Sequence, residues 1–276
     1  MKKAMLLLSV LAVIAAGCSS AADDPELVGI RASSDPAVGD ARFLFAVSQI
    51  DGVRRGGPDE AVSIVATSLD APEVSLETDA IFEWVVPDGF GLYRAELPFD
   101  RAGLWEIDFT VSTGEITQPF LVDVQAEPTT VSVGDAAPIL DTPTIPDTPI
   151  EDLTTDGDPL LTLYDTSLGE AIGNGRPTVV IFATPAYCTS AACGPLLQQT
   201  KDASATYPDV DFVHIEVYEG FNEPDFAPDT DHLVPAVVAF NLPSEPWIFV
   251  MDEDGMIIAR FEGVLGEGEL ESVLES

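Results

Sequence analysis

The first half of the chain alternates hydrophobic and polar residues in short runs separated by turn residues. Residues 91–97 and 104–111 alternate closely, and similar short runs occupy residues 41–47, 61–66 and 120–124. Alternation places every second side chain on one face, as in a half-buried β-strand. About seven strands at short, regular spacing, without a helical stretch, predict an immunoglobulin-like antiparallel β-sandwich over residues 25–126.

The second half of the chain has a different pattern. Residues 178–182 are a continuous apolar run rich in β-branched side chains, which is typical of a parallel strand buried on both faces. The other predicted elements are a short helix at 167–172, a helix at 195–206, a strand at 211–218, a hairpin formed by 247–251 and 256–261, and a terminal helix at 267–274. This order of strand, helix, strand, hairpin and helix predicts an α/β domain over residues 159–276.

Residues 127–158, between these two patterns, are rich in Pro, Thr and Asp. Proline fixes φ and has no amide hydrogen to donate to a β-ladder. The composition therefore predicts an extended linker or a poorly structured lead-in to the second domain.

The N-terminus has the pattern of an export signal. Lys2 and Lys3 precede an apolar run over residues 5–16, which is too short for a membrane-spanning helix. The run ends in Ala15-Ala16-Gly17-Cys18, which resembles the bacterial lipobox, although Ala15 stands where that family more often has Leu. The resemblance implies a signal peptide over residues 1–18, a lipid on Cys18, and an extracytoplasmic protein anchored to the cell membrane. A plain secretory signal is the alternative.

The charge and composition of the chain limit the kinds of ligand that it is expected to bind. The chain has 48 Asp and Glu residues against 11 Lys and Arg, a formal net charge of −37. Nucleic acid is not an expected partner, because binding phosphates needs clustered Lys and Arg. Three cysteines and two histidines leave little material for a metal cage, so neither a metal nor a cofactor is predicted. After export and processing only Cys188 and Cys193 remain to pair with each other, in a compartment that permits disulfides.

The element order of the second domain, with cysteines just after the first buried strand, resembles the thioredoxin fold. The residues that carry the resemblance are Phe182-Ala183-Thr184-Pro185-Ala186-Tyr187-Cys188, Cys193-Gly194-Pro195 and Glu245-Pro246-Trp247. The resemblance implies a cysteine at a helix N-terminus, where backbone amides and the helix dipole stabilise a thiolate. It also implies a cis peptide bond before Pro246, beside the active-site sulfur. The implied activity is thiol-disulfide exchange by Cys188 and Cys193 with protein thiols and disulfides outside the cytoplasm.

The segment 91–111 of the first domain resembles the YtkA-like and CopC-like immunoglobulin-type domains. The resemblance is carried by Gly91 and Tyr93, by Pro98-Phe99, and by Ala102-Gly103-Leu104-Trp105. The residues of this half show no catalytic constellation, which predicts a spacer or binding module. Because large aromatic side chains are usually buried, Trp105 is expected to be a core residue.

The spacing of the two cysteines departs from the two-residue gap of the thioredoxin family. Four residues separate Cys188 from Cys193, and two such positions in one straight helix would lie roughly 8–9 Å apart, beyond the ~7 Å limit for a disulfide. A disulfide therefore requires Cys188 to precede the helix or the first turn to unwind, and Pro195 favours a helix start near Gly194.

The attacking sulfur is Cys188 if positions are counted from the strand, and Cys193 if they are counted from Cys-Gly-Pro. We favour Cys188, because exposure in a loop suits attack on a partner disulfide. The buried acid that the family carries on the preceding strand is absent, since residues 179–182 are apolar. Proton transfer would therefore need water or another carboxylate.

Three other functions fit parts of the pattern. Q-type peroxiredoxins also use cysteines five positions apart, with a Thr and a Pro upstream that resemble Thr184 and Pro185, although here Thr184 is one residue further from the cysteine and no arginine is well placed. A copper-binding protein similar to Sco proteins would combine the cysteines with His214 or His232, a donor set suited to Cu(I). The third is a redox-inert interaction module in which the disulfide only staples a loop.

Overall fold

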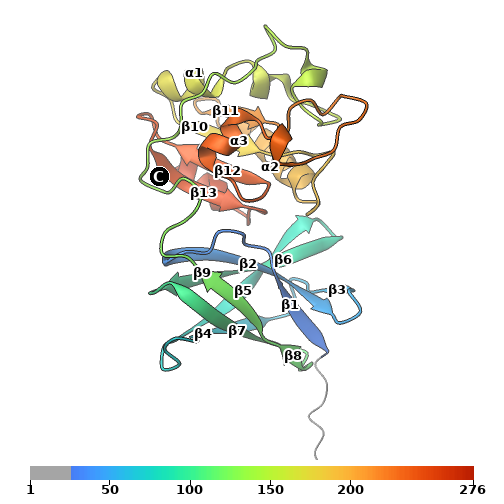
Figure 1. Cartoon of the computed structure of the whole chain (residues 1–276), viewed down its shortest axis with the longest axis vertical. Coiled ribbons are helices and arrows are strands. Elements are labelled where there is room, and N and C mark those ends of the chain that lie inside the picture. Colours follow the sequence, from blue (N-terminus) through green and yellow to red (C-terminus); the bar gives the residue numbers. More distant parts are fainter. Residues whose placement is uncertain (1–25) are drawn as a thin grey trace, which may run out of the picture.

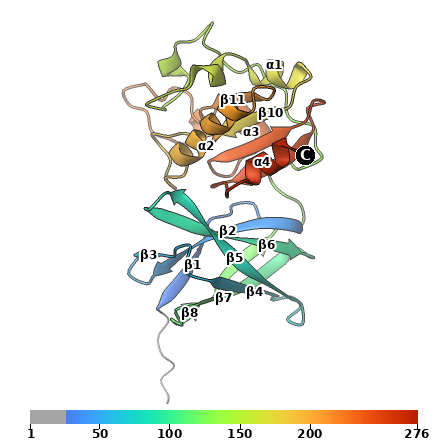
Figure 2. The same ribbon diagram turned by 180° about the vertical axis from the view of Figure 1, so that it is seen from behind.

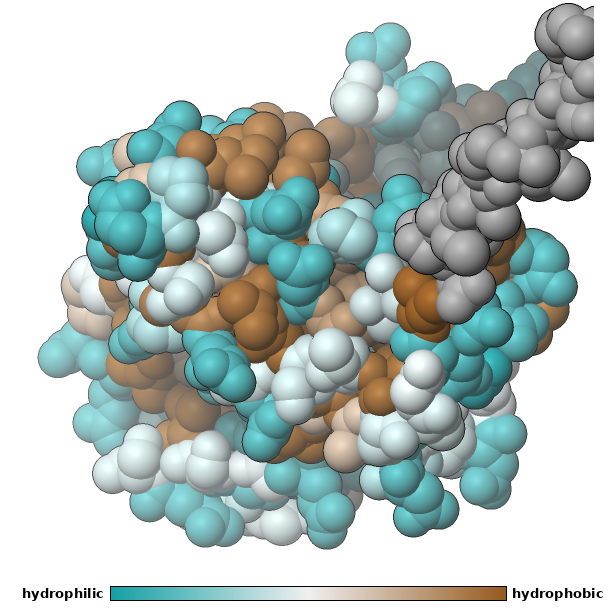
Figure 3. Space-filling model, turned by 90° about the horizontal axis from the view of Figure 1, so that it is seen from below, coloured by the Kyte–Doolittle hydropathy of each residue, from teal (hydrophilic) through white to brown (hydrophobic). Residues whose placement is uncertain are grey.

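The computed structural model describes residues 26–276, so the predicted signal peptide and Cys18 lie outside the described residues. An all-β region and an α/β region are stacked end to end along the long axis of the molecule (Figures 1 and 2). The end of the all-β region that faces away from the α/β region shows hydrophobic side chains scattered among hydrophilic ones (Figure 3). No helix within residues 26–276 is long and apolar enough to cross a membrane.

The N-terminal region is a β-sandwich. Its strands are β1 (Leu27–Arg31), β2 (Gly39–Gln49), β3 (Arg54–Arg55), β4 (Val62–Ser68), β5 (Ser75–Val86), β6 (Phe90–Phe99), β7 (Gly103–Val111), β8 (Thr117–Gln118) and β9 (Phe120–Val124). They follow the order β8-β1-β2-β6-β5-β4-β7-β9, and β3 pairs with β2. The first part of β5 pairs with β4 and its second part pairs with β6, so this strand passes from one sheet to the other. The groups β1-β2-β6-β5 and β4-β7-β9 match the two sheets of an immunoglobulin domain, which confirms the predicted fold class.

The alternation in the sequence produces the sandwich core. Phe43, Phe45, Tyr93, Trp105 and Phe109 are at most 1% exposed and belong to one apolar cluster. The indole nitrogen of Trp105 donates to the carbonyl of Arg101 at 3.2 Å. The prediction that Trp105 is a core residue is therefore confirmed.

The C-terminal region is built around the mixed sheet β11-β10-β12-β13. Its elements are η1 (Ile150–Asp152), η2 (Leu161–Tyr164), α1 (Leu168–Gly173), β10 (Thr178–Phe182), α2 (Cys193–Thr206), β11 (Asp211–Ile215), η3 (Thr230–His232), α3 (Pro235–Phe240), β12 (Trp247–Met251), β13 (Ile257–Glu262) and α4 (Glu269–Leu274). β10 is parallel to β11 and antiparallel to β12. All five residues of β10 are buried, because α2 and α4 pack on one face of the sheet and α1 and α3 on the other.

The sequence predicted no helix between residues 218 and 247, but this segment contains α3 (Pro235–Phe240). Pro235 is the first residue of α3, and Asn241 ends the helix in the left-handed conformation. A six-residue helix is too short to show a helical repeat, and its two adjacent valines favour a strand. Packing against the sheet rather than intrinsic propensity stabilises this helix, since Val237 and Phe240 are at most 3% exposed.

The proline-rich residues 127–158 are irregular apart from the short η1, but they pack closely on the α/β region. Ala137 and Leu153 insert into the hydrophobic layers on opposite faces of the sheet. The backbone amide of Ile145 donates to the carbonyl of Tyr164 at 3.0 Å. The prolines therefore prevent regular structure without freeing the segment, because its apolar residues are buried.

Candidate active site

The only disulfide within residues 26–276 joins Cys188 to Cys193, whose Cα atoms are 6.0 Å apart. This separation lies in the normal range for a disulfide. β10 ends at Phe182 and α2 begins at Cys193, so Cys188 lies in the loop before the helix. This is the first of the two arrangements that the four-residue gap allowed, and the helix begins one residue before the predicted start near Gly194.

The two sulfurs have different surroundings. Cys193 is fully buried, whereas Cys188 is only partly buried. The amide of Cys193, at the first position of α2, donates to Sγ of Cys188 at 3.2 Å. The hydroxyl of Ser190 also lies 3.3 Å from this sulfur. Because helix N-terminal amides stabilise a thiolate, the geometry favours Cys188 as the attacking sulfur.

The Glu245–Pro246 peptide bond is the only cis bond within residues 26–276. Trp247, the first residue of β12, pairs with Phe182, the last residue of β10. Pro246 therefore lies at the same edge of the sheet as the loop that carries Cys188. The structure thus contains the expected cis bond, and the catalytic role of Pro246 stays a prediction.

A buried carboxylate at this edge was missed by the sequence interpretation. Glu216 directly follows Ile215, the register partner of Phe182, and is 5% exposed. Its Oε2 accepts hydrogen bonds from the amide and the hydroxyl of Thr155, both at 2.8 Å. The Thr155 hydroxyl in turn accepts from the amide of Ala186, two residues before Cys188, at 3.1 Å. The family's acid on β10 is absent, but the neighbouring strand supplies a carboxyl group joined to the cysteine loop through one threonine.

Burial raises the pKa of Glu216 above the ordinary glutamate value. Burial also raises the pKa of Glu245, and the nearby charge of Glu216 raises it further. Carboxyl groups with raised pKa values can exchange protons nearer to neutral pH than ordinary ones. The sequence placed Glu216 inside the predicted strand 211–218, and no rule distinguishes it there from the many surface acids of this chain.

The histidines do not form a metal centre with the cysteines. Nδ1 of His214 lies 2.7 Å from the hydroxyl of Tyr164, and its Nε2 lies 3.0 Å from the carbonyl of Ala183. Burial lowers the pKa of His214 to about 4, so the ring is neutral at pH 7. Nδ1 of His232 lies 2.7 Å from Asp229. Within residues 26–276 no group of three or more His, Cys, Asp or Glu side chains could hold a metal ion, which gives the copper alternative no support.

The downstream arginine that a peroxidase site would need is engaged elsewhere. Nη1 of Arg260 lies 3.2 Å from Asp35 of the sandwich, and it also donates to the hydroxyl of Thr130. Arg260 therefore joins the two regions of the molecule. Its contacts give no support to a peroxide-polarising role beside Cys188.

Comparison with known families agrees with this geometry. Residues 164–276 match the model of a family described as a thioredoxin-like domain. No curated protein matches the chain.

Proposed function

We propose, on the premise that residues 164–276 form a thioredoxin-like domain, that the protein is a lipid-anchored extracytoplasmic thiol-disulfide oxidoreductase. One observation carries the proposal. Cys188 is partly exposed and its sulfur accepts a hydrogen bond from the first backbone amide of α2, whereas its disulfide partner Cys193 is fully buried. This asymmetry separates an attacking cysteine from a resolving one, which thiol-disulfide exchange requires.

The exchange proceeds in two balanced steps. In the reducing direction, the Cys188 thiolate attacks a partner disulfide, forms a mixed disulfide and releases one partner sulfur as a thiolate. The Cys193 thiolate then attacks Sγ of Cys188, which forms the intramolecular disulfide and releases the second partner sulfur. Two electrons pass from the cysteine pair to the partner, and the released thiolates take up two protons. Glu216 and Glu245, with their raised pKa values, are the candidate carboxyl groups for receiving the Cys193 proton directly or through water.

The anchor is proposed from the lipobox resemblance at Cys18. β1 begins at Leu27, nine residues later, a span of roughly 30 Å at full extension. β1 starts at the end of the sandwich that faces away from the α/β region (Figure 1). A lipid on Cys18 would therefore place the sandwich between the membrane and the disulfide. We expect radiolabelled palmitate to enter the wild-type protein but not Cys18→Ser, and a Cys18→Ser protein that stays in the membrane fraction would contradict the anchor.

A trapping experiment tests the redox function. With Cys193→Ser, the mixed disulfide at Cys188 cannot be resolved, so covalent adducts with exported proteins should accumulate and disappear on reduction. Cys188→Ser should form far fewer adducts, because its remaining sulfur is buried. The double variant is the matched control. Equal and negligible trapping by both single variants would contradict the proposal and favour a static disulfide.

A further inference from the structure

The β-sandwich makes a hydrophobic contact with the cysteine loop itself. Leu44 of β2 and Val85 of β5 form one buried cluster with Ala192 and Val264 of the α/β region. All four side chains are at most 3% exposed. Ala192 lies inside the ring that the disulfide closes, directly before Cys193, and is the N-cap residue of α2. The sandwich therefore contacts the loop that the disulfide closes, which loses this covalent restraint when the disulfide is reduced.

The two sandwich residues in this contact point away from the sandwich core. Phe43 and Phe45 belong to that core, and successive strand side chains face opposite sides, so Leu44 faces the α/β region. Val85 is buried, whereas its neighbour Trp84 is 37% exposed. Leu44 and Val85 are thus buried between Val86, Phe90 and Leu92 of the sandwich and the neighbouring α/β region.

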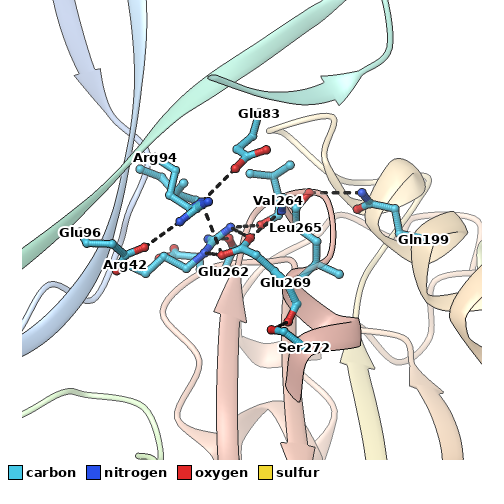
Figure 4. Close-up of polar contacts among 12 residues, drawn as sticks. Arg42, Glu83, Arg94, Glu96, Gln199, Glu262, Val264, Leu265, Glu269 and Ser272 are labelled. Carbon is cyan, nitrogen blue, oxygen red and sulfur yellow. Dashed lines mark hydrogen bonds and ion pairs between the residues drawn. The ribbon is translucent and has the colours of Figure 1, made fainter. Parts of the chain in front are cut away.

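Polar contacts fix the position of the sandwich against this loop. The guanidinium of Arg42 binds both carboxylate oxygens of Glu269, at 2.8 and 2.6 Å, and also donates to the carbonyl of Val264 at 2.5 Å. Arg94 lies 3.0 Å from Glu83 and 3.5 Å from Glu269. Figure 4 shows these side chains converging on the segment that carries Val264 and Leu265.

The same segment also contacts α2. The carboxamide of Gln199, on α2, donates to the carbonyl of Leu265 at 3.3 Å (Figure 4). Residues 264–265 thus lie between the sandwich and the helix that begins at Cys193. The apolar cluster therefore connects the sandwich to Ala192 at the start of α2, and a polar path through residues 264–265 connects it to Gln199 in the middle of the helix.

We propose that Val85, with Leu44, is a positioning residue for the redox pair, holding Ala192 and thereby the Cys193 end of the loop. This inference rests on the proposed redox function. On the other side of Ala192, Ala191 is exposed and has a φ of 61°, a conformation that residues with a side chain rarely adopt. When the disulfide is reduced, the ring no longer holds this loop. Thr155 still holds its N-terminal end through Ala186, and the cluster with Val85 is the restraint at its Cys193 end. A restrained loop keeps the two sulfurs close and favours the disulfide, because less conformational entropy is lost when it forms again.

The direction of the effect follows from this restraint. Reduction by glutathione consumes two glutathione thiols, yields one glutathione disulfide, and transfers two electrons and two protons to the cysteine pair. Loosening Ala192 adds conformations to the reduced state that the disulfide must remove. The disulfide should then be easier to reduce, and its potential should become less negative.

The test compares Val85→Ser with Ile81→Ser in the full chain. Ile81 is on the same strand but is 56% exposed, so its replacement is a matched control. We measure the equilibrium constant with glutathione by thiol trapping at a temperature where thermal melts show each protein folded. We expect the disulfide of Val85→Ser to be about tenfold easier to reduce, which corresponds to about 30 mV, and Ile81→Ser to stay within twofold of wild type. Should Val85→Ser fail to fold, Val85→Ala removes only the two methyl groups, and we expect a shift of about threefold.

Two further results separate the possible failures. Equilibrium constants within twofold of wild type in a folded Val85 variant would overturn the positioning role while leaving exchange intact. A wild-type disulfide that does not exchange with glutathione or dithiothreitol would instead contradict the proposed function itself. Hydrogen exchange gives an independent readout: the amide of Cys193 should exchange faster in the reduced Val85→Ser protein than in reduced wild type, and equal rates would also overturn the inference.

Discussion

The interiors of the sandwich and of the α/β region differ in chemistry. The sandwich core is an aromatic and aliphatic cluster that includes Phe43, Phe45, Phe99, Trp105 and Phe109. Its buried carboxylates, Asp35 and Glu83, bind arginines at the boundary with the α/β region or beside it. The α/β region instead buries a cysteine, an imidazole and a carboxylate near one edge of its sheet.

Because of this difference, mutations in the two regions are expected to affect different properties of the protein. An apolar core stabilises the sandwich through burial alone. Buried polar groups require hydrogen-bond partners and bring shifted pKa values. The sandwich is therefore expected to respond to mutation mainly in stability, and the α/β region to respond in pH dependence and redox behaviour.

The largest expected effect is on the sandwich core. Phe45 is fully buried and its ring stacks with Tyr93 at a centroid distance of 5.6 Å. Phe45→Ala should lower the free energy of unfolding of the sandwich by about 3–5 kcal/mol, because it leaves a cavity in a close-packed core. Urea unfolding measures this loss. The glutathione equilibrium constant of the folded variant should stay within twofold of wild type. A larger change would show that the sandwich core also affects the redox behaviour of the α/β region.

The next effect concerns His214 and acid pH. Its pKa is lowered by burial from 6.5 to about 4, so the unfolded chain takes up a proton at a higher pH than the folded protein does. The stability that the neutral ring contributes is complete above about pH 6.5 and is lost as the pH falls toward 4, a change of about 3 kcal/mol. His214→Gln should be less stable at pH 7 but should lose less stability between pH 7 and pH 4. Parallel stability curves for the two proteins, measured by urea unfolding, would contradict this account.

A smaller effect is expected where Thr155 links Glu216 to the cysteine loop. Thr155→Val removes the hydroxyl that donates to Glu216 and accepts from Ala186. The loss of partners for a buried carboxylate should lower stability by about 1–3 kcal/mol and raise the pKa of Glu216 further. Thr155→Ser keeps the hydroxyl and is the control. If both variants unfold at the same urea concentration as wild type, the link does not contribute to stability.

The smallest predicted change is at the boundary between the two regions. Arg42→Lys keeps the charge but cannot bind both oxygens of Glu269 in the planar geometry of a guanidinium. We expect a loss of about 1 kcal/mol in thermal unfolding. Arg101→Lys is the matched control, because Arg101 pairs with Asp100 at an exposed site. An equal loss at both positions would show that the boundary pair contributes no more than a surface pair.

The sequence predicted the elements better than their contacts. Alternation and apolar runs follow from secondary structure itself, so β2, β4, β6, β7, β9 and β10 could be placed from spacing alone, whereas β1 and β5 were not among the predicted runs. The requirement that Cys188 precede the helix followed from helix geometry and is confirmed by the structure.

Contacts between distant segments could not be predicted in this way. Leu44 breaks the alternation between Phe43 and Phe45, a sign of a strand covered on both faces, but the sequence does not identify what covers it. The carboxylate of Glu216 accepts its hydrogen bonds from Thr155, which lies 61 residues away in the sequence. Residues 127–158 were interpreted from their prolines, whereas Ala137 and Leu153 determine where this segment packs.

The proposed function requires the Cys188–Cys193 pair to exchange electrons with partner proteins. The most direct measurement is the reduction potential of this pair in the wild-type full chain, obtained by thiol trapping in glutathione or dithiothreitol buffers of known potential. A partly exposed cysteine beside a helix N-terminus predicts a value above about −300 mV. A value below that limit would identify the disulfide as a structural staple and would contradict the proposed function.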